Sequence, residues 1–195
     1  MFARFFKYTE LRTKITSLFA FLMSTAYLFY IKAAINPLRT MVFFASMFIF
    51  DLTTTAINNY TDSKTNGQDI GYGRRGGLAI ILAMLFISVC AGLYLYYLTD
   101  IVVLVVGVVC FTSGIFYTFG PLPISRQPLG EIFSGVFYGF MIPFLIFYIN
   151  LPQGTILTYS ISWKAIGASI NLLPFAKLIL LSFVPLCTTA DIIRI

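Results

Sequence analysis

The chain has 195 residues, of which 59% are hydrophobic and only 10% are charged, and its mean hydropathy is +0.91. This much apolar surface excludes an ordinary soluble domain and predicts a protein that crosses the lipid bilayer several times. The formal net charge of +6 does not indicate nucleic-acid binding, because the basic residues lie in short segments between apolar runs. The sequence has no histidine, which excludes imidazole ligands for a metal.

Apolar runs separated by breakers predict an all-α transmembrane helix bundle, formed as one domain over residues 1–195. A spanning helix needs about 20 apolar residues. The predicted helices, in chain order, are residues 15–35, 41–57, 78–98, 101–119, 129–149 and a sixth that starts near Pro174. Proline-containing breakers follow the first, fourth and fifth of these helices. The mixed stretch 155–173 is predicted to lie at the membrane interface, with Trp163 as an anchor.

Positive charge is concentrated on one side of this topology. With the N-terminus inside the cell, the cytoplasmic segments hold Arg4, Lys7, Arg12, Lys14, Lys64, Arg74, Arg75, Arg126 and Arg194, and the opposite side holds Lys32, Arg39, Lys164 and Lys177. The positive-inside rule therefore predicts a multi-pass protein of the plasma (inner) membrane with a cytoplasmic N-terminus. This orientation also brings the polar loops 62–77 and 120–128 to the same, cytoplasmic face.

The polar residues that best suit chemistry follow the second predicted helix, in the run Asn58-Asn59-Tyr60-Thr61-Asp62. Asn58 and Asp62 are four residues apart, so on a helix they share one face. Asp51 and Thr55 lie on roughly the same stripe, which would point into a helix bundle and not at lipid. A carboxylate inside a membrane helix is costly, so Asp51 is either functional or hydrogen-bonded to a neighbouring helix.

The polar loop after this run combines acidic, amide and basic side chains with glycines. It contains Lys64, Asn66, Asp69, Arg74 and Arg75, together with Gly67, Gly71, Gly73, Gly76 and Gly77. Magnesium binds one or two carboxylates together with phosphate oxygens, and arginine neutralises the remaining phosphate charge. The pattern therefore predicts a site for Mg²⁺ and a diphosphate above an apolar cavity. The plainer interpretation is a polar helix end followed by a positive-inside arginine pair.

The second cytoplasmic loop contributes two further candidates. Tyr117 precedes a turn at Gly120-Pro121, and Glu131 opens the fifth predicted helix. Glu131 has two interpretations: a carboxylate near the positive end of a helix dipole, or a buried carboxylate that orients a partner in the first loop. The abundant aromatic rings could stabilise a carbocation by their faces, although aromatic residues are also ordinary in membrane proteins.

At these residues the chain resembles the UbiA superfamily of membrane prenyltransferases, and within it most closely the 1,4-dihydroxy-2-naphthoate polyprenyltransferases of menaquinone synthesis. Three pieces match in order, and the resemblance covers nearly the whole chain. They are Asn58-Asn59-Tyr60-Thr61-Asp62 with residues 67–71 and Arg75-Gly76; Tyr117-Thr118 with Gly120-Pro121 and Pro123; and Leu129-Gly130-Glu131 with Gly135 and Gly139. The first piece is specific, and the other two mainly support it.

The resemblance implies a helical bundle around a cavity open to lipid, with two aspartate-rich motifs that hold Mg²⁺ and the diphosphate of a polyprenyl donor. Departure of the diphosphate leaves an allylic cation, which the aromatic acceptor attacks; dihydroxynaphthoate then loses carbon dioxide. By position, Asn58 and Asp62 would bind the metal and diphosphate, and Asp69 would be a further catalytic residue. The implied substrate-binding residues are Asp51, Thr55, Asn59, Lys64, Arg75, Tyr117 and Glu131, of which Arg75 would bind diphosphate or the acceptor carboxylate.

The chain also departs from the family pattern. Asn59 stands where an aspartate is usual, which removes one charge from the metal site, and Asn66 is a one-residue insertion. About six of the family's roughly nine helices are predicted, and the second aspartate-rich motif is missing from residues 188–195. The resemblance therefore implies a C-terminally truncated or split enzyme, inactive or very weak alone, with a possible partner chain that supplies the missing helices.

Other functions stay open on the sequence alone. The acceptor could be 4-hydroxybenzoate or haem in place of dihydroxynaphthoate, or the chain could be a non-catalytic remnant that binds isoprenoid. A small transporter is disfavoured, because its polar residues would gather near the middle of the membrane and not at the cytoplasmic helix ends.

Overall fold

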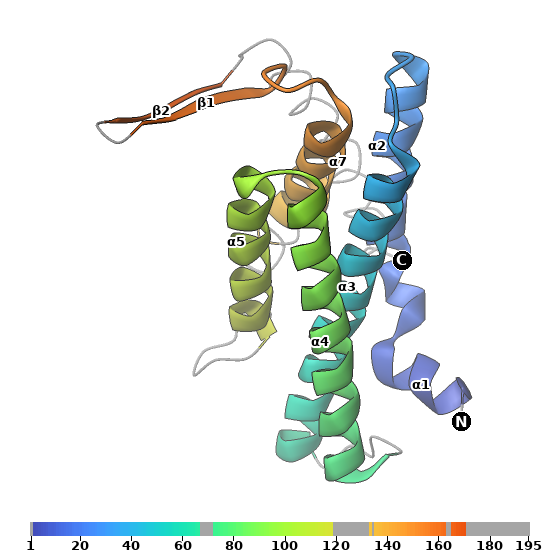
Figure 1. Cartoon of the computed structure of the whole chain (residues 1–195). Coiled ribbons are helices and arrows are strands. Elements are labelled where there is room, and N and C mark those ends of the chain that lie inside the picture. The colour runs from blue at the N-terminus through green and yellow to red at the C-terminus, as the bar shows by residue number, and fades with distance from the viewer. Residues whose placement is uncertain (1, 67–71, 119–132, 134, 163–164, 171–195) are drawn as a thin grey trace. The chain divides into compact units, whose positions relative to one another are not determined.

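The computed structural model describes residues 2–66, 72–118, 133, 135–162 and 165–170, and helices dominate them (Figure 1). The helices are α1 (Phe2–Thr9), the 3-10 helix η1 (Leu11–Lys14), α2 (Ile15–Tyr30), α3 (Pro37–Asn66), α4 (Gly73–Leu98), α5 (Ile101–Thr118), the π-helix η3 (Gly135–Met141) and α7 (Ile142–Asn150). An antiparallel hairpin of β1 (Leu157–Ser162) and β2 (Ala165–Ile170) follows, with Leu157 opposite Ile170 and Ser162 opposite Ala165.

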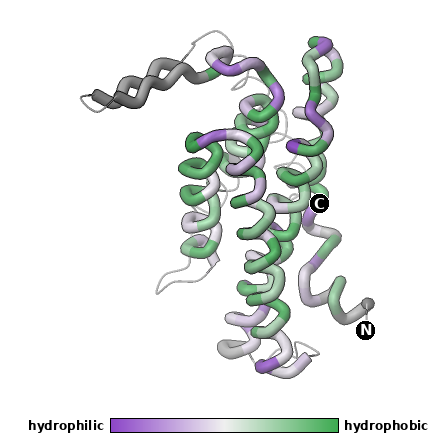
Figure 2. The backbone as a smooth tube through the Cα atoms, viewed as in Figure 1, coloured by the Kyte–Doolittle hydropathy of each residue, from purple (hydrophilic) through white to green (hydrophobic). Residues whose placement is uncertain are grey.

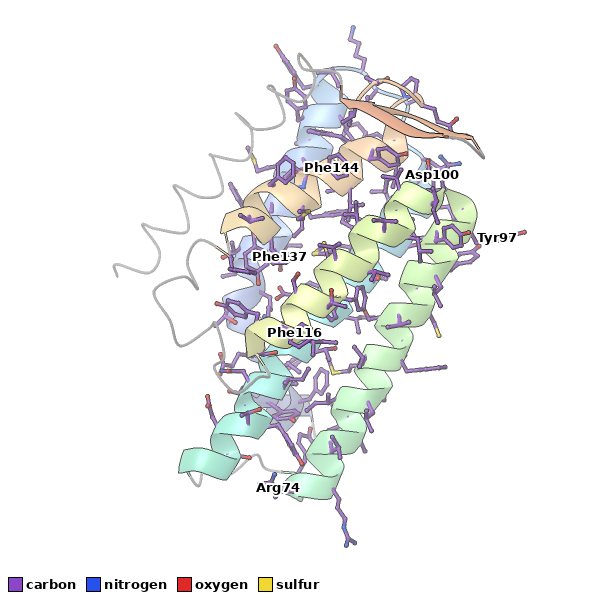
Figure 3. The ribbon with its side chains drawn as sticks, turned by 90° about the vertical axis from the view of Figure 1, so that its left-hand side faces the viewer. Arg74, Tyr97, Asp100, Phe116, Phe137 and Phe144 are labelled. Atoms are coloured by element: carbon purple, nitrogen blue, oxygen red, sulfur yellow. The ribbon has the colours of Figure 1, made fainter. Side chains whose placement is uncertain are left out.

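Among the described residues, three helices are long and apolar enough to cross a membrane: Pro37–Ser63 within α3, and the whole of α4 and α5. The helix α2 and the stretch Gly135–Asn150 are shorter apolar helices. Hydrophilic residues gather mainly near the helix ends (Figure 2), with Arg74 at the start of α4 and Asp100 just past its other end (Figure 3). Few side chains of α4 and α5 are buried, as expected for apolar helices that face lipid. The predicted class, an all-α membrane protein built from packed helices, is confirmed.

The helix boundaries correct the predicted polar loop 62–77. The helix α3 continues through the motif to Asn66, and α4 begins at Gly73, so that most of this stretch is helical. The run from Asn58 to Asn66 contains neither proline nor glycine and therefore nothing that stops the helix. Gly73 has a φ of 64°, a left-handed conformation that glycine adopts without steric cost, and it starts the next helix.

The hairpin is an addition to the all-helical prediction. Residues 155–173 were expected to be a mixed stretch at the membrane interface, whereas residues 157–162 and 165–170 form β1 and β2. The sequence of β1, Leu-Thr-Tyr-Ser-Ile-Ser, alternates apolar and polar residues as a strand does. Trp163 and the sixth predicted helix near Pro174 lie outside the described residues.

The chain divides into two compact units. The first comprises Met1–Leu18 and Met41–Phe133, and the second comprises Phe19–Thr40 and Ser134–Ile195. The first unit therefore contains most of α3, all of α4 and α5, and the N-terminal segment that leads into α2.

Within the first unit, α3 and α4 are joined by a reciprocal pair of serine hydrogen bonds. The Ser46 hydroxyl donates to the Ser88 carbonyl at 3.0 Å, and the Ser88 hydroxyl donates to the Ser46 carbonyl at 2.7 Å. Both side chains are buried. Small side chains let membrane helices approach closely, and their hydroxyls supply the polar contacts that hold the helices together.

The contact between α3 and α5 depends on a glycine. The rings of Phe50 and Phe111 lie 4.1 Å apart between centroids, and the Phe50 ring covers the backbone at Gly114. A Cβ atom at Gly114 would lie 2.7 Å from Phe50 Cε1, which is closer than real side chains allow. A larger residue at this position would therefore displace the aromatic pair.

We expect Gly114→Ala to destabilise the protein relative to Gly107→Ala in the same helix. Both changes gain the same helix propensity, but a Cβ at Gly107 meets no atom within 4 Å. The difference in the free energy of unfolding should be about 1–3 kcal/mol, the usual effect of overpacking. Thermal unfolding of both variants in detergent measures this difference. Equal stability of the two variants would show that the Phe50 ring moves aside without cost.

In the second unit, the buried side chain of Asn150 joins the start of α3 to the end of α7. Its Oδ1 accepts hydrogen bonds from the Asn36 backbone N–H at 2.8 Å and from the Thr40 hydroxyl at 3.2 Å. Its Nδ2 donates to the Ile146 carbonyl at 2.9 Å. Tyr27 of α2 packs on Phe147 of α7 with ring centroids 5.5 Å apart. Asn150, read from the sequence only as part of a helix breaker, thus also holds two helices together.

Candidate functional site

The last turns of α3 hold the two residues predicted to bind a metal and a diphosphate. The Asn58 amide donates to Asp62 Oδ2 at 3.3 Å, and both side chains are half-buried. Residues four apart meet on one helix face, so this contact follows directly from the continuation of α3 through the motif. The prediction that Asn58 and Asp62 share a face is confirmed.

The first turn of α4 brings an arginine pair close to the same end of α3. The guanidinium carbon of Arg74 lies 5.0 Å from the centre of the Tyr60 ring, a cation–π contact. Both Arg74 and Arg75 are exposed. The sequence suggested that these arginines belong to a flexible loop, whereas the structure places them in a helix. This contact joins the first turn of α4 to Tyr60, which lies two residues before Asp62 in α3.

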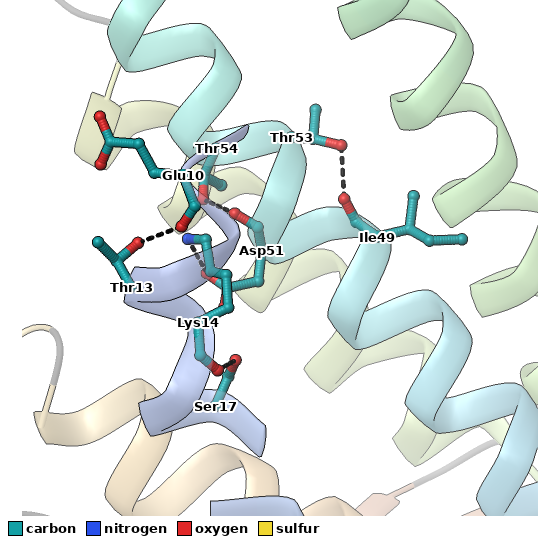
Figure 4. A network of polar contacts seen from close by, with 8 residues as sticks. All are labelled: Glu10, Thr13, Lys14, Ser17, Ile49, Asp51, Thr53 and Thr54. Atoms are coloured by element: carbon teal, nitrogen blue, oxygen red, sulfur yellow. Dashed lines mark hydrogen bonds and ion pairs between the residues drawn. The ribbon is translucent and has the colours of Figure 1, made fainter. Parts of the chain in front are cut away.

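Asp51, the first residue of the predicted polar stripe along α3, forms an ion pair. Lys14 Nζ lies 2.8 Å from Asp51 Oδ1, and both side chains are buried (Figure 4). Asp51 lies roughly 16 Å from Asp62 along the helix axis at 1.5 Å per residue. The sequence offered a link to a neighbouring helix as one interpretation of Asp51, but Lys14 was read only as a topology signal. A buried carboxylate needs a cation close by, so Asp51 was itself the signal in the sequence that a basic side chain should lie beside it.

Asn59 points to a different neighbour from Asn58. Its Nδ2 donates to the Tyr8 carbonyl at 2.9 Å and to Glu10 Oε1 at 3.1 Å. Tyr8 in turn donates its hydroxyl to the Gly77 carbonyl at 3.3 Å. The sequence did not indicate that Tyr8 and Glu10 adjoin the motif, because about fifty residues separate them from it.

The remaining predicted site residues are described only in part. Thr55 lies half-buried on α3, and Tyr117 lies half-buried near the end of α5, 6.3 Å from Phe133 between ring centroids. The backbone of Lys64 belongs to α3, but its side chain is outside the described part of the structure, as are Asp69 and Glu131. Their assignments stay predictions.

The described residues include no group of three or more histidine, cysteine, aspartate or glutamate side chains that could enclose a metal ion. The Asn58–Asp62 pair offers carboxylate and amide oxygens, which are ligands that suit Mg²⁺. Because Mg²⁺ keeps several waters and takes most other ligands from substrate phosphates, one carboxylate beside an amide fits a metal that arrives with a diphosphate. The neighbouring arginines suit the same anion.

A comparison with curated proteins found a relative of the chain. The chain is 29% identical over 138 residues to a protein of Bacillus subtilis (strain 168) named 1,4-dihydroxy-2-naphthoate octaprenyltransferase. The match covers 65% of this chain and 44% of the relative, so the chain spans less than half of the relative's length. No protein-family model and no solved structure matches the chain. The resemblance to membrane prenyltransferases, drawn above from the motif residues, is supported by this match.

Proposed function

We propose that this chain forms part of a membrane prenyltransferase, which moves a polyprenyl group from its diphosphate to an aromatic acceptor. The observation that carries the proposal is the contact between Asn58 and Asp62 near the end of α3, where an apolar span ends. The exposed arginines of the first turn of α4 lie at the same end of α3, where Arg74 contacts Tyr60. A polyprenyl diphosphate has a charged head and a long apolar tail, and this juxtaposition suits both parts. The named prenyltransferase relative supports the same conclusion.

Asp62 and Asn58 would hold Mg²⁺ through their carboxylate and amide oxygens. When bound with the diphosphate, Mg²⁺ neutralises the charge that develops on the leaving group. Arg74 and Arg75 would neutralise the rest, and the Tyr60 ring holds the Arg74 guanidinium in place for this role. We assign Asp69 to the same site as a further catalytic residue.

The allylic carbon–oxygen bond of the donor breaks, and the electron pair leaves with the diphosphate. The electron-rich acceptor ring then attacks the allylic carbon, and a new carbon–carbon bond forms. The ring regains aromaticity by losing a proton or, for an acceptor with a carboxylate at that carbon, by losing carbon dioxide. Tyr117 would stabilise the cation by its ring face, and Glu131 would orient a partner in the first loop.

We propose 1,4-dihydroxy-2-naphthoate as the acceptor, because the Bacillus relative carries that compound in its name. This acceptor places the protein in menaquinone synthesis. We propose a location in the plasma (inner) membrane, and the charge distribution supports a cytoplasmic N-terminus. We also propose a partner chain that supplies further helices to the site, as the resemblance to the prenyltransferases implies.

The first test is binding of geranylgeranyl diphosphate to the purified chain in detergent, with and without Mg²⁺. We expect binding that requires Mg²⁺, whereas a chain without a diphosphate site would show none and would contradict the proposal. Membranes that contain the chain are then supplied with Mg²⁺, the same donor and either 1,4-dihydroxy-2-naphthoate or 4-hydroxybenzoate. Prenylated naphthol identifies the reaction, and prenylated hydroxybenzoate would replace the proposed acceptor.

A further inference from the structure

Residues 8–14, here called the N-terminal strap, are attached to both helices that flank the candidate site. Tyr8 donates its hydroxyl to the Gly77 carbonyl in the first turns of α4. Asn59 of α3 donates to the Tyr8 carbonyl, and Lys14 forms the buried ion pair with Asp51 of α3. The strap therefore contacts α3 at two levels and α4 at one.

The Tyr8 end of the strap is part of a small apolar core. Tyr8 is buried together with Ala56 and Ile81, and its ring lies 6.1 Å from that of Tyr72 between centroids. Burial raises the pKa of Tyr8 to about 12, with a smaller contribution from Tyr60, so the hydroxyl stays protonated at physiological pH and keeps its donor role.

The middle of the strap has a fixed backbone. Glu10 has a φ of 46°, a left-handed conformation that is uncommon for residues other than glycine. Its carbonyl accepts hydrogen bonds from both the N–H and the hydroxyl of Thr13, each at 2.9 Å. This turn holds the Glu10 side chain on the side where Asn59 reaches it.

Asn59 faces the strap and donates to two acceptors on it. Its Nδ2 donates one hydrogen bond to the Tyr8 carbonyl at 2.9 Å and another to the Glu10 carboxylate, at Oε1, at 3.1 Å. Only a side chain with two N–H donors can make both bonds. An aspartate at position 59 has no donor and would place a second negative charge beside Glu10, so this neighbourhood explains why an amide stands there.

We propose that Asn59 is a positioning residue and not a ligand of the metal or diphosphate. Through Asn59 the strap fixes the rotation of the last turns of α3, and with it the direction in which Asn58 and Asp62 face. Asn59 is adjacent to Asn58 and three residues before Asp62, so any turn of the helix at residue 59 moves both. The inference rests on the proposed function, because it assigns Asn58 and Asp62 to the diphosphate site.

The test compares Asn59→Asp, Asn59→Ala, Glu10→Gln and the double variant Asn59→Asp/Glu10→Gln with the wild-type chain. For each, Mg²⁺-dependent binding of geranylgeranyl diphosphate is measured by equilibrium titration. Amide hydrogen exchange of residues 8–14 is measured without any ligand. The exchange measurement reports whether the strap is attached, and the titration reports whether attachment matters to the site.

The charge of residue 59 separates the two possible roles. For a positioning residue, Asn59→Asp should weaken binding about tenfold and speed exchange in the strap, because two hydrogen bonds are lost and two carboxylates face each other. Asn59→Ala should weaken binding less, and Glu10→Gln should stay within about threefold of wild type, since its side-chain oxygen still accepts the Asn59 bond. The double variant should recover most of the loss, because the amide introduced at position 10 can donate to the carboxylate introduced at position 59.

Two results would overturn the proposal. Tighter Mg²⁺-dependent binding by Asn59→Asp, whatever stands at position 10, would identify residue 59 as a direct ligand. Faster exchange in the strap with unchanged diphosphate binding would reduce the strap to a purely structural role. Absence of binding by the wild-type chain is a different result, since it contradicts the proposed function itself and the positioning role together with it.

Discussion

Replacing Asp62 with asparagine is expected to weaken Mg²⁺-dependent binding of geranylgeranyl diphosphate by about 100-fold or more. Asparagine has the same size and can still accept the hydrogen bond from Asn58, so α3 should keep its structure. What is lost is the only charge of the Asn58–Asp62 pair, and with it the attraction for the cation that accompanies the diphosphate. Titration of the ligand at several Mg²⁺ concentrations measures the effect, and prenyl transfer, where the chain supports it, should fall in parallel.

The matched control for this variant is Asp100→Asn, which makes the same change in charge beyond the other end of α4. Asp100 Oδ1 accepts a hydrogen bond from the Val102 N–H at 3.1 Å, a bond that asparagine makes equally well. The Asp100→Asn variant should bind geranylgeranyl diphosphate as tightly as the wild-type chain does. Equal losses in both variants would point to a general charge effect, and wild-type binding by Asp62→Asn would remove Asp62 from the site.

Replacing Lys14 with methionine is expected to lower the free energy of unfolding by about 3–5 kcal/mol, the usual cost of breaking a buried ion pair by removing one partner. The carboxylate of Asp51 would stay buried without the lysine charge 2.8 Å away. The loss should also detach the strap from the middle of α3. Unfolding of the variant in detergent, by heat or by added SDS, measures the change in stability.

Two further variants define the cause of that loss. Lys32 is exposed, so Lys32→Met makes the same substitution without breaking a buried pair and should be close to neutral. The double variant Lys14→Met/Asp51→Leu removes both charges and should regain most of the stability, because apolar side chains of similar size can replace a buried ion pair. A Lys14→Met variant as stable as wild type would mean that the carboxylate is hydrated or protonated in the fold.

Local patterns in the sequence predicted the helices well. Hydropathy placed the end of α4 and the start of α5 at the observed residues, because a membrane span is recognisable from composition alone. The start of α4 was placed five residues too late, at Leu78 in place of Gly73, because the first turn of α4 is polar and rich in glycine. The spacing of Asn58 and Asp62 was enough to predict their contact, since it depends only on the period of a helix. The end of α3 was placed too early, because polar residues were taken as the end of a helix that in fact contains no breaker.

Contacts between distant segments could not be predicted in the same way. The bonds of Asn59 to Tyr8 and Glu10 depend on how the N-terminal segment folds back onto α3. Nothing in the run Asn58-Asn59 distinguishes a residue that faces a substrate from one that faces another segment, since the two differ only by about 100° around the helix. The hairpin β1–β2 was overlooked for another reason: its alternation is short, and it was judged against a chain of long apolar runs.

The attachment of the strap also has a consequence for the order in which the protein is assembled. The segment that contains Tyr8 and Lys14 is synthesised early, but its partners Asp51, Asn59 and Gly77 follow 37 to 69 residues later. Because a chain emerges from the ribosome starting at its N-terminus, the strap cannot close until α3 and the start of α4 have been made and inserted. During that interval Lys14 has no access to Asp51 and stays in water, where, in the proposed topology, it can act as a positive charge that retains the N-terminus in the cytoplasm. One lysine would thus serve first to orient the nascent chain and later to hold the finished protein together.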